Sequence, residues 1–138
     1  MYFTAGFGRQ VEMLRRAMSV SSLRGDVIAN NIANSDTPNF KRSVVNFESA
    51  LERAIASEQV RPFPALVTDE RHMPFRRPID WREVKPSVVW DYLSSSKNNG
   101  NNVDIEQESM DQLHNQMMYT TLAQAVSNAF GQVNIVLR

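Results

Sequence analysis

The feature that most constrains the fold of this chain is the asparagine-rich stretch 29–40, which closes a long segment with a helical pattern. Asparagine is a poor residue for a helix interior, so Asn30, Asn31 and Asn34 must be offset by capping or inter-helix hydrogen bonds. Asn34 can take the left-handed conformation that ends many helices. Pro38 then prevents the helix from continuing. In an arbitrary protein this stretch would predict a polar helix cap and a turn.

The segment before this stretch predicts a long helix over about residues 7–34. Its apolar and small residues are spaced alternately by three and four, which is the period of a coiled-coil seam. They are Val11, Leu14, Met18, Ser21, Gly25, Ile28 and Ile32. Because Ser21 and Gly25 are small, we expect a bend or the close approach of a second helix near Gly25.

A second long helix is predicted from about residue 105 to the C-terminus. Asp104 is a good N-cap residue, and Gln107 stands three residues later in the capping-box position. The seam of this helix is clearest in its second half, at Leu122, Val126, Ala129, Val133 and Val136. Earlier apolar residues, Met110, Leu113 and Met117, lie on a displaced face.

The middle of the chain predicts less regular structure. A short helix is expected at about 46–57, because Phe47, Leu51 and Ile55 recur every four residues. Prolines then recur too often for a long element, although 87–90 has the pattern of a strand fragment. The aromatic residues of this region either cover an apolar face of the helices or lie scattered on a surface linker; they are Phe63, Phe75, Trp81 and Trp90. Residues 94–102 predict a mobile polar loop.

These patterns predict a mainly α fold. Two long terminal helices pack in a coiled-coil-like manner, with a short third helix and an irregular central segment that has room for a short strand pair. The chain is expected to divide into residues 1–40, 41–58, 59–102 and 103–138.

Composition argues against several kinds of partner. Fifteen basic residues balance fifteen acidic ones, which leaves no electrostatic footprint for nucleic acid or anionic lipid. No apolar run approaches the ~20 residues of a membrane helix, and the N-terminus lacks a signal-peptide pattern. We therefore expect no nucleic-acid partner and no direct lipid insertion; taken alone, these features indicate a cytoplasmic protein.

The sequence offers little for catalysis, a cofactor or a metal. His72 and His114 are the only histidines and cysteine is absent, so a zinc site would lack ligands. Asp104, Glu108 and Asp111 share a helical face, and together with His114 they define a hypothesis of a metal-dependent hydrolase. Acidic residues near a helix N-terminus are more often partners of the helix dipole. We expect neither an enzyme nor a cofactor.

The motif turn 37–40 completes a pattern that resembles the bacterial flagellar rod and hook proteins. These proteins carry Ala-Asn-Asn-hydrophobic-Ala-Asn, two variable residues, Thr-x-Gly and an aromatic residue. Here Thr37 and Pro38 fit that pattern, Asn39 replaces the glycine, and Phe40 stands for the usual tyrosine. The departure is mild, because asparagine is the best substitute for glycine where a positive φ is needed.

A second motif begins at Gly100 and is similar to the C-terminal motif of the flagellar basal-body rod proteins. It comprises Gly100, Asn101, Asn102, Val103, Asp104, Ile105 and Glu106, followed by Met110, Leu113, Asn115 and Tyr119. Thr68 with Arg71, His72 and Met73 resembles a run in the same proteins. A neighbouring type of proximal-rod subunit usually has Gly-Tyr-Val and Pro-Asn-Val before its last helix, and this chain lacks both. The resemblance covers both ends of the chain and part of its middle.

The resemblance implies a structural subunit of the proximal rod that transmits torque for motility. Such subunits leave the cytoplasm through the flagellar type III export apparatus without a cleaved signal peptide and occupy the periplasmic part of the basal body. The implied partners are copies of this chain, other rod subunits, the inner-membrane ring, rod-base adaptor proteins and the export gate. The alternative is a soluble helical adaptor or chaperone of the export system, which would use the same apolar stripes on one client.

The assembly interface is expected on the apolar seams and on the asparagines at the end of the first helix. A seam that one chain cannot fully cover would be buried against neighbouring subunits. The expected interface residues are Val11, Leu14, Met18, Ile28, Asn30, Asn31, Ile32, Asn34, Leu122, Val126, Ala129 and Val133.

Overall fold

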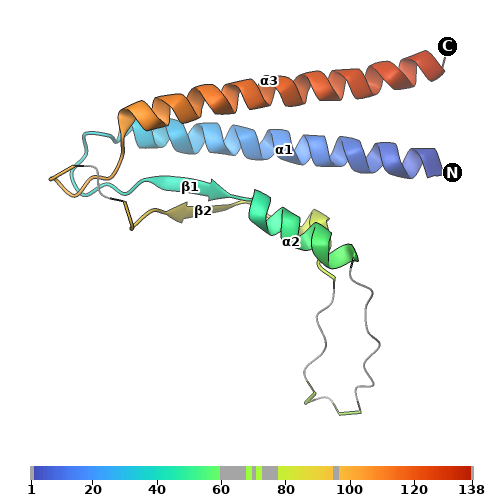
Figure 1. Ribbon diagram of the computed structural model, residues 1–138, viewed down its shortest axis with the longest axis horizontal. Coiled ribbons are helices and arrows are strands. Elements are labelled where there is room, and N and C mark those ends of the chain that lie inside the picture. The colour runs from blue at the N-terminus through green and yellow to red at the C-terminus, as the bar shows by residue number, and fades with distance from the viewer. Residues whose placement is uncertain (1, 60–67, 70, 73–77, 95–96, 138) are drawn as a thin grey trace. The chain divides into compact units, whose positions relative to one another are not determined.

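The computed structural model describes residues 2–59, 68–69, 71–72, 78–94 and 97–137 (Figure 1). Its elements are α1 (Tyr2–Ala33), β1 (Ser43–Asn46), α2 (Glu48–Gln59), the 3-10 helix η1 (Trp81–Glu83), β2 (Ser87–Trp90) and α3 (Ile105–Val136). The chain divides into two compact units, a helical unit of residues 1–45 with 88–138, and a central unit of residues 46–87. No helix in the described parts of the chain is long and apolar enough to cross a membrane.

The helical unit is built on α1 and α3, which lie side by side and run in opposite directions (Figure 1). Both helices have 32 residues, so each is about 48 Å long at 1.5 Å per residue. The two predicted terminal helices are confirmed. The helix α1 begins five residues earlier than the predicted start at about residue 7, and near that end the rings of Phe7 and Phe130 meet edge to face at 5.9 Å.

The two long helices approach closely where α1 carries its small residues. A Cβ atom at Gly25 would lie 3.3 Å from the amide nitrogen of Asn115 on α3. The hydroxyl of Ser21 donates to Asn115 Oδ1 at 2.9 Å, and Asn115 Nδ2 donates to the Ser21 carbonyl at 2.8 Å. The predicted close approach near Gly25 is therefore confirmed, and α1 remains one unbroken helix through it.

The N-terminus of α3 has the predicted cap but lacks the predicted capping box. The Asp104 carboxylate accepts from the backbone nitrogens of Glu106 and Gln107 at 2.9 and 3.5 Å. The Gln107 side chain donates instead to Asp111 Oδ1 at 3.2 Å. The capping-box prediction is wrong because an acceptor one turn further along α3 takes this amide.

Strands β1 and β2 form an antiparallel two-stranded ribbon (Figure 1). The Asp91 nitrogen donates to the Arg42 carbonyl at 2.8 Å, just beyond the ends of both strands. The predicted strand at 87–90 is confirmed, and its partner is the segment 43–46. Along β1, Val44 is exposed whereas Val45 is buried, as the two-residue period of a strand requires.

The central unit contains α2, which lies two residues later than the predicted 46–57, and η1. Ala54 on α2 and Trp81 on η1 are both buried, and the Ser57 hydroxyl accepts from the Ile79 nitrogen at 2.9 Å. Of the two alternatives for the aromatic residues, the surface position fits Trp90, which is 62% exposed. Its ring meets the ring of Tyr92 edge to face. Phe63, Phe75 and Met73 lie outside the described residues.

Candidate functional site

The motif turn after α1 is a run of short backbone turns. The Asn34 nitrogen donates to the Asn30 carbonyl at 3.1 Å, and the Thr37 nitrogen donates to the Asn34 carbonyl at 3.1 Å. Asn39 has φ 61° and is the one non-glycine residue with positive φ in the described part of the chain. Asn39 thus adopts the positive φ that the glycine of the motif would adopt. The expectation that Asn34 takes the left-handed conformation is wrong.

The C-terminal motif lies directly against this turn. Gly100 has φ 78°, and a Cβ atom there would lie 2.6 Å from Asn39 Oδ1, so a side chain at position 100 would clash. The Asn39 nitrogen donates to the Asn99 carbonyl at 3.1 Å, and Lys41 Nζ donates to the Gly100 carbonyl at 2.7 Å. The two motifs that stand about 60 residues apart in the sequence therefore form one junction.

Asn101 occupies the centre of this junction and is 1% exposed. Its Nδ2 donates to the carbonyls of Asn34, Ser35 and Thr37 at 2.8–2.9 Å, and its Oδ1 accepts from the Val103 nitrogen at 2.7 Å. The last helical carbonyls of α1 are paired with the backbone nitrogens of Asn34 and Ser35, and the carbonyls of the turn that follows are paired with the side chain of Asn101.

Asn102 closes the end of the β-ribbon. Its Oδ1 accepts from the Arg42 nitrogen at 2.7 Å, and its Nδ2 donates to the Asp91 carbonyl at 2.6 Å. The side chain bridges two backbone groups that would otherwise pair with each other in an antiparallel ladder. The loop 94–102 is therefore not simply polar and solvated, because Asn101 and Asn102 are both buried.

Asn31 joins α1 to both the ribbon and α3. Its Oδ1 accepts from the Ser43 nitrogen at 3.0 Å, and its Nδ2 donates to the Ser43 carbonyl and to Glu108 Oε2, each at 2.9 Å. Asn31 is 1% exposed and Glu108 is fully buried. One amide therefore pairs the outer edge of β1 and holds a buried carboxylate.

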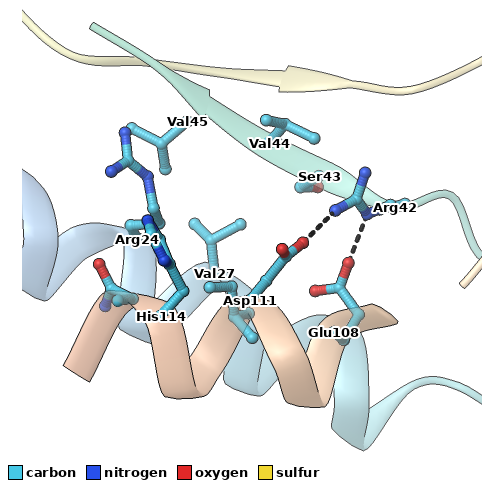
Figure 2. A pocket seen from close by; sticks show the side chains of 11 residues that line it. Arg24, Val27, Arg42, Ser43, Val44, Val45, Glu108, Asp111 and His114 are labelled. Atoms are coloured by element: carbon cyan, nitrogen blue, oxygen red, sulfur yellow. Dashed lines mark hydrogen bonds and ion pairs between the residues drawn. The ribbon is translucent and has the colours of Figure 1, made fainter. Parts of the chain in front are cut away.

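The Glu108 carboxylate is also paired with Arg42, which precedes β1 (Figure 2). Arg42 Nη2 donates to Asp111 Oδ2 at 2.9 Å, and all three residues line a cavity of about 310 Å³ between α1, β1 and α3. Burial alone would lower the pKa of Arg42, but the hydrogen bond and charge of Glu108, followed by the charges of Asp111 and Asp91, raise it. The guanidinium therefore stays charged and compensates the buried carboxylate.

This arrangement contradicts a metal site on α3. Glu108 and Asp111 both accept from Arg42, and Asp104 caps the helix. His114 lines the same cavity (Figure 2). Within the described ranges no group of three His, Asp or Glu residues could hold a metal ion. The helix-dipole explanation is incomplete too, since the partner of Glu108 is a guanidinium from another part of the chain.

The residues predicted for the assembly interface lie on the facing sides of α1 and α3 or near them. Ile28, Asn31 and Ala129 are buried, and Asn30 is exposed. The others are partly buried: Val11, Leu14, Met18, Ile32, Asn34, Leu122, Val126 and Val133. Asn34 donates to the Asn30 carbonyl at 2.8 Å as a capping amide. As contacts between chains, these residues stay predictions.

The sequence interpretation missed the polar half of the α3 seam. Glu108, Asp111 and Asn115 continue, in steps of three, four and seven, into the seam at Leu122, and Glu108 and Asn115 are buried. An analysis restricted to apolar residues therefore followed Met110, Leu113 and Met117, which are 52–69% exposed. The coiled-coil spacing is unbroken from Glu108 to Leu122 when polar residues are included, and this spacing predicts the whole seam.

The outer surface of α3 carries no ionised Asp, Glu, Lys or Arg after its third turn. Between Gln112 and Leu137 none of these four residue types occurs. Large apolar side chains are nevertheless exposed along this stretch, and Leu113, Met117 and Ile135 share the side of the helix that lies opposite its seam. Solvated helix faces normally carry charge, so this face has the composition of a surface that protein covers.

Comparison with known proteins gives consistent results. Residues 12–41 match the family model described as "Flagella basal body rod protein". The flagellar basal body rod protein FlgB of Borrelia hermsii is 43% identical over 132 residues, which cover 96% of this chain and 98% of that protein. FlgB of Borreliella burgdorferi is 42% identical with the same coverage. FlgB of Bacillus subtilis is 32% identical over 131 residues, with 95% of each chain covered.

Proposed function

Because this chain belongs to the FlgB family of flagellar basal body rod proteins, we propose that it is a structural subunit of the proximal rod. It assembles through α1 and α3 with copies of itself and with other rod subunits, and the resulting tube transmits torque for motility. At the base of the rod its neighbours are the inner-membrane ring, rod-base adaptor proteins and the export gate. The subunit reaches the periplasm through flagellar type III export without a cleaved signal peptide.

The observation that carries this proposal is the charge-free outer face of α3. Exposed Leu113 and Met117 lie on one face of a stretch that has no Asp, Glu, Lys or Arg. The cores of protein interfaces are depleted in charge, and this face combines exposed apolar side chains with uncharged polar ones. Burial against neighbouring subunits would stabilise the assembly by about 25 cal/mol per Å² of apolar area.

The partly buried seam residues support the same proposal. Leu14, Met18 and Val126 are only partly covered within one chain, so each long helix keeps apolar surface for a second contact. Contacts that join different faces of identical subunits do not close on themselves and generate helical arrays. A subunit with one exposed face on α3 and partial exposure along α1 therefore suits a tube.

The junction of the two motifs supports a mechanical role. Asn101, Asn102 and Asn31 fix the end of the helix pair through hydrogen bonds that are buried or partly buried. Buried and fully paired polar networks favour a single geometry. A rigid end of the helix pair suits a subunit that must transmit torque.

The alternative, a soluble adaptor or chaperone of the export system, is not favoured. The three relatives described above are all named as rod proteins. No contact in the described residues favours a single client over repeated subunits.

A charge placed on the outer face of α3 tests the proposal. In a strain lacking the chromosomal gene, Met117→Glu should abolish swimming and remove the rod seen by cryo-tomography, whereas Met117→Gln should restore both. Glutamine and glutamate have similar helix propensity, so the pair separates charge from the loss of the methionine. Normal rods with Met117→Glu would contradict the use of this face.

A deletion of the gene tests the role itself. Loss of the rod, restored by the intact gene, is the expected result. Normal rods in the deletion strain would contradict the proposed function, whatever the variants of α3 do.

A further inference from the structure

We infer that Glu108 determines which helix α3 pairs with. It favours α1 of the same chain, and it acts against the pairing of α3 with α3 of a second copy. The inference rests on the proposed function and deepens it, because an assembling rod brings many α3 helices close together. It concerns the seam of α3 that packs against α1, which is distinct from the outer face of α3.

The seam of α3 has the pattern of a helix that can pair with itself. One heptad position recurs along it in steps of seven residues, and it is occupied by Glu108, Asn115, Leu122, Ala129 and Val136. In a parallel pair of two α3 helices, residues at the same heptad position lie opposite each other. From Leu122 onward these residues are apolar, and apolar contact is not directional. The second half of α3 therefore does not distinguish α1 from another α3.

The buried amide of Asn115 does not prevent self-pairing either. On α1 its partner is Ser21, which it meets through two hydrogen bonds. In a parallel pair of α3 helices, two Asn115 side chains would face each other, and an amide is both a donor and an acceptor. Such a pair satisfies both amides, so Asn115 fixes a register without excluding a second α3.

Glu108 is the seam residue that depends on partners from outside α3. It is fully buried. Its Oε2 accepts from Asn31 of α1 at 2.9 Å, and its Oε1 is paired with Arg42, which precedes β1. A second α3 could not replace the guanidinium, because α3 contains no lysine or arginine and its one histidine, His114, lies at another heptad position.

Self-pairing of α3 over its full length is therefore unfavourable in either direction. In a parallel pair, two Glu108 carboxylates would face each other across the seam, where like charges repel. In an antiparallel pair that overlaps from end to end, Glu108 would lie near Val133, and an unpaired buried carboxylate is strongly destabilising. Pairs that overlap only through the second half leave the first half of each seam uncovered. A residue that disfavours the wrong partner contributes to specificity in this way.

Removal of the carboxylate together with its guanidinium tests the inference. Arg42→Met with Glu108→Leu replaces a buried ion pair by apolar side chains, a change that proteins often tolerate. The matched control, Arg53→Met with Glu106→Leu, makes the same two exchanges at exposed positions. Sedimentation velocity of the free subunits should give the first variant a Kd for self-association at least about tenfold lower than that of the control, because no carboxylate is buried in the new pair.

Crosslinking between thiols locates the new contact, since the chain has no cysteine. Leu122→Cys places a thiol on the seam near the middle of α3, whereas Met117→Cys places one on the outer face. In the variant without the ion pair, a short bis-maleimide should join two chains through Leu122→Cys. Association without this crosslink, or with a crosslink through Met117→Cys alone, would overturn the inference, because the outer face would then be the contact.

Equal Kd values for the folded variant and its control would also overturn the inference. If Arg42→Met with Glu108→Leu does not fold, Arg42→Met with Glu108→Gln takes its place, because the amide still accepts from Asn31. A crosslink between chains through Leu122→Cys in an otherwise unchanged subunit would overturn the inference whether or not either variant folds. The proposed function would survive each of these results, since the deletion strain tests it.

Discussion

At the scale of single residues, asparagine side chains form hydrogen bonds with backbone groups that no helix or strand pairs. An amide offers both a donor and an acceptor, so Asn101, Asn102 and Asn31 each pair with more than one backbone group. All three are buried. Their value lies in what their removal would leave unpaired, because a buried polar group without a partner costs more than a formed hydrogen bond gains.

Asn101→Ala should strongly destabilise the free subunit. It would leave carbonyls of the motif turn and the Val103 nitrogen without their partner, at a cost of about 2–4 kcal/mol in the free energy of unfolding. Urea denaturation measures this difference. Asn98→Ala is the control, since Asn98 is exposed in the same loop and should change stability by less than about 0.5 kcal/mol. Equal effects of the two variants would contradict the role of Asn101.

The two glycines Gly25 and Gly131 should respond in opposite ways to alanine. Alanine in a helix interior gains about 1 kcal/mol over glycine, and a Cβ at Gly131 meets nothing within 4 Å. At Gly25 the new Cβ would lie 3.3 Å from Asn115 Nδ2, which is held by its bond to Ser21. Thermal unfolding should show stabilisation by Gly131→Ala and destabilisation by Gly25→Ala. A higher melting temperature for both variants would show that α1 and α3 can move apart at Gly25 without cost.

The stability of the chain should depend on acid through Asp91. The Ser94 hydroxyl, followed by the Leu93 and Ser94 nitrogens, lowers the pKa of this carboxyl below its ordinary value of 3.8. Because the folded-state pKa is the lower one, the stabilisation is complete above pH 3.8 and is lost as pH falls through the folded-state pKa. The difference in stability between the parent and Asp91→Asn should therefore shrink below pH 3.8 in urea titrations. A constant difference across this range would contradict the assignment.

At the scale of elements, α3 has two halves with different chemistry. Its first half contacts α1 and the ribbon through Glu108, Asp111 and Asn115, which are held by ion pairs and hydrogen bonds. Its second half contacts α1 through apolar and small residues such as Ala129, which is buried. Polar pairs fix register because each donor has one acceptor, whereas apolar contact supplies most of the free energy. The first half therefore sets the alignment of the two helices.

Removal of Arg42 should show the cost of a buried carboxylate. Arg42→Met leaves Glu108, which is fully buried, without its guanidinium, and this should destabilise the subunit by about 3–5 kcal/mol. The double variant Arg42→Met with Glu108→Gln should recover at least about 1 kcal/mol, because a neutral amide still accepts from Asn31. Urea denaturation of both variants measures how much free energy of unfolding the double variant recovers. No recovery in the double variant would mean that the charge of Glu108 is not the source of the cost.

At the scale of the whole molecule, the contacts that fold the helical unit and the face proposed for assembly can be separated. Ile28 is buried between the elements of one chain, whereas Met117 is 58% exposed on the outer face of α3. A variant at Ile28 that stops swimming is therefore ambiguous, because the subunit itself is damaged. A variant at Met117 is not.

Ile28→Asp and Met117→Glu should have different effects on the stability of the free subunit, but both should stop swimming. An aspartate at Ile28 buries an unpaired charge and should unfold the helical unit or destabilise it by more than about 3 kcal/mol. Met117→Glu should leave the urea midpoint within about 0.5 kcal/mol of the parent, yet swimming should stop in both. If Met117→Glu also unfolds the free subunit, α3 is covered within the chain and the proposed face is wrong.

The sequence by itself determined the helices, the end of α1, the start of α3 and the family. Helical spacing, the Asp104 cap and the stop at Pro38 act over a few residues, so the chain specifies them locally. The positive φ at Asn39 belongs to the same class, because the left-handed conformation is a property of one residue and its neighbours. The charge-free stretch after Asp111 was also present in the sequence.

Only the tertiary structure decided which polar residues meet. The three carbonyls bound by Asn101, the guanidinium beside Glu108 and the Ser43 backbone paired by Asn31 are pairings across 12–67 residues of sequence. Side-chain polarity does not encode a partner, since an amide can pair with any backbone group that the fold presents. The junction of the two motifs followed from the antiparallel packing of α1 and α3, and that packing depends on contacts that no local pattern specifies.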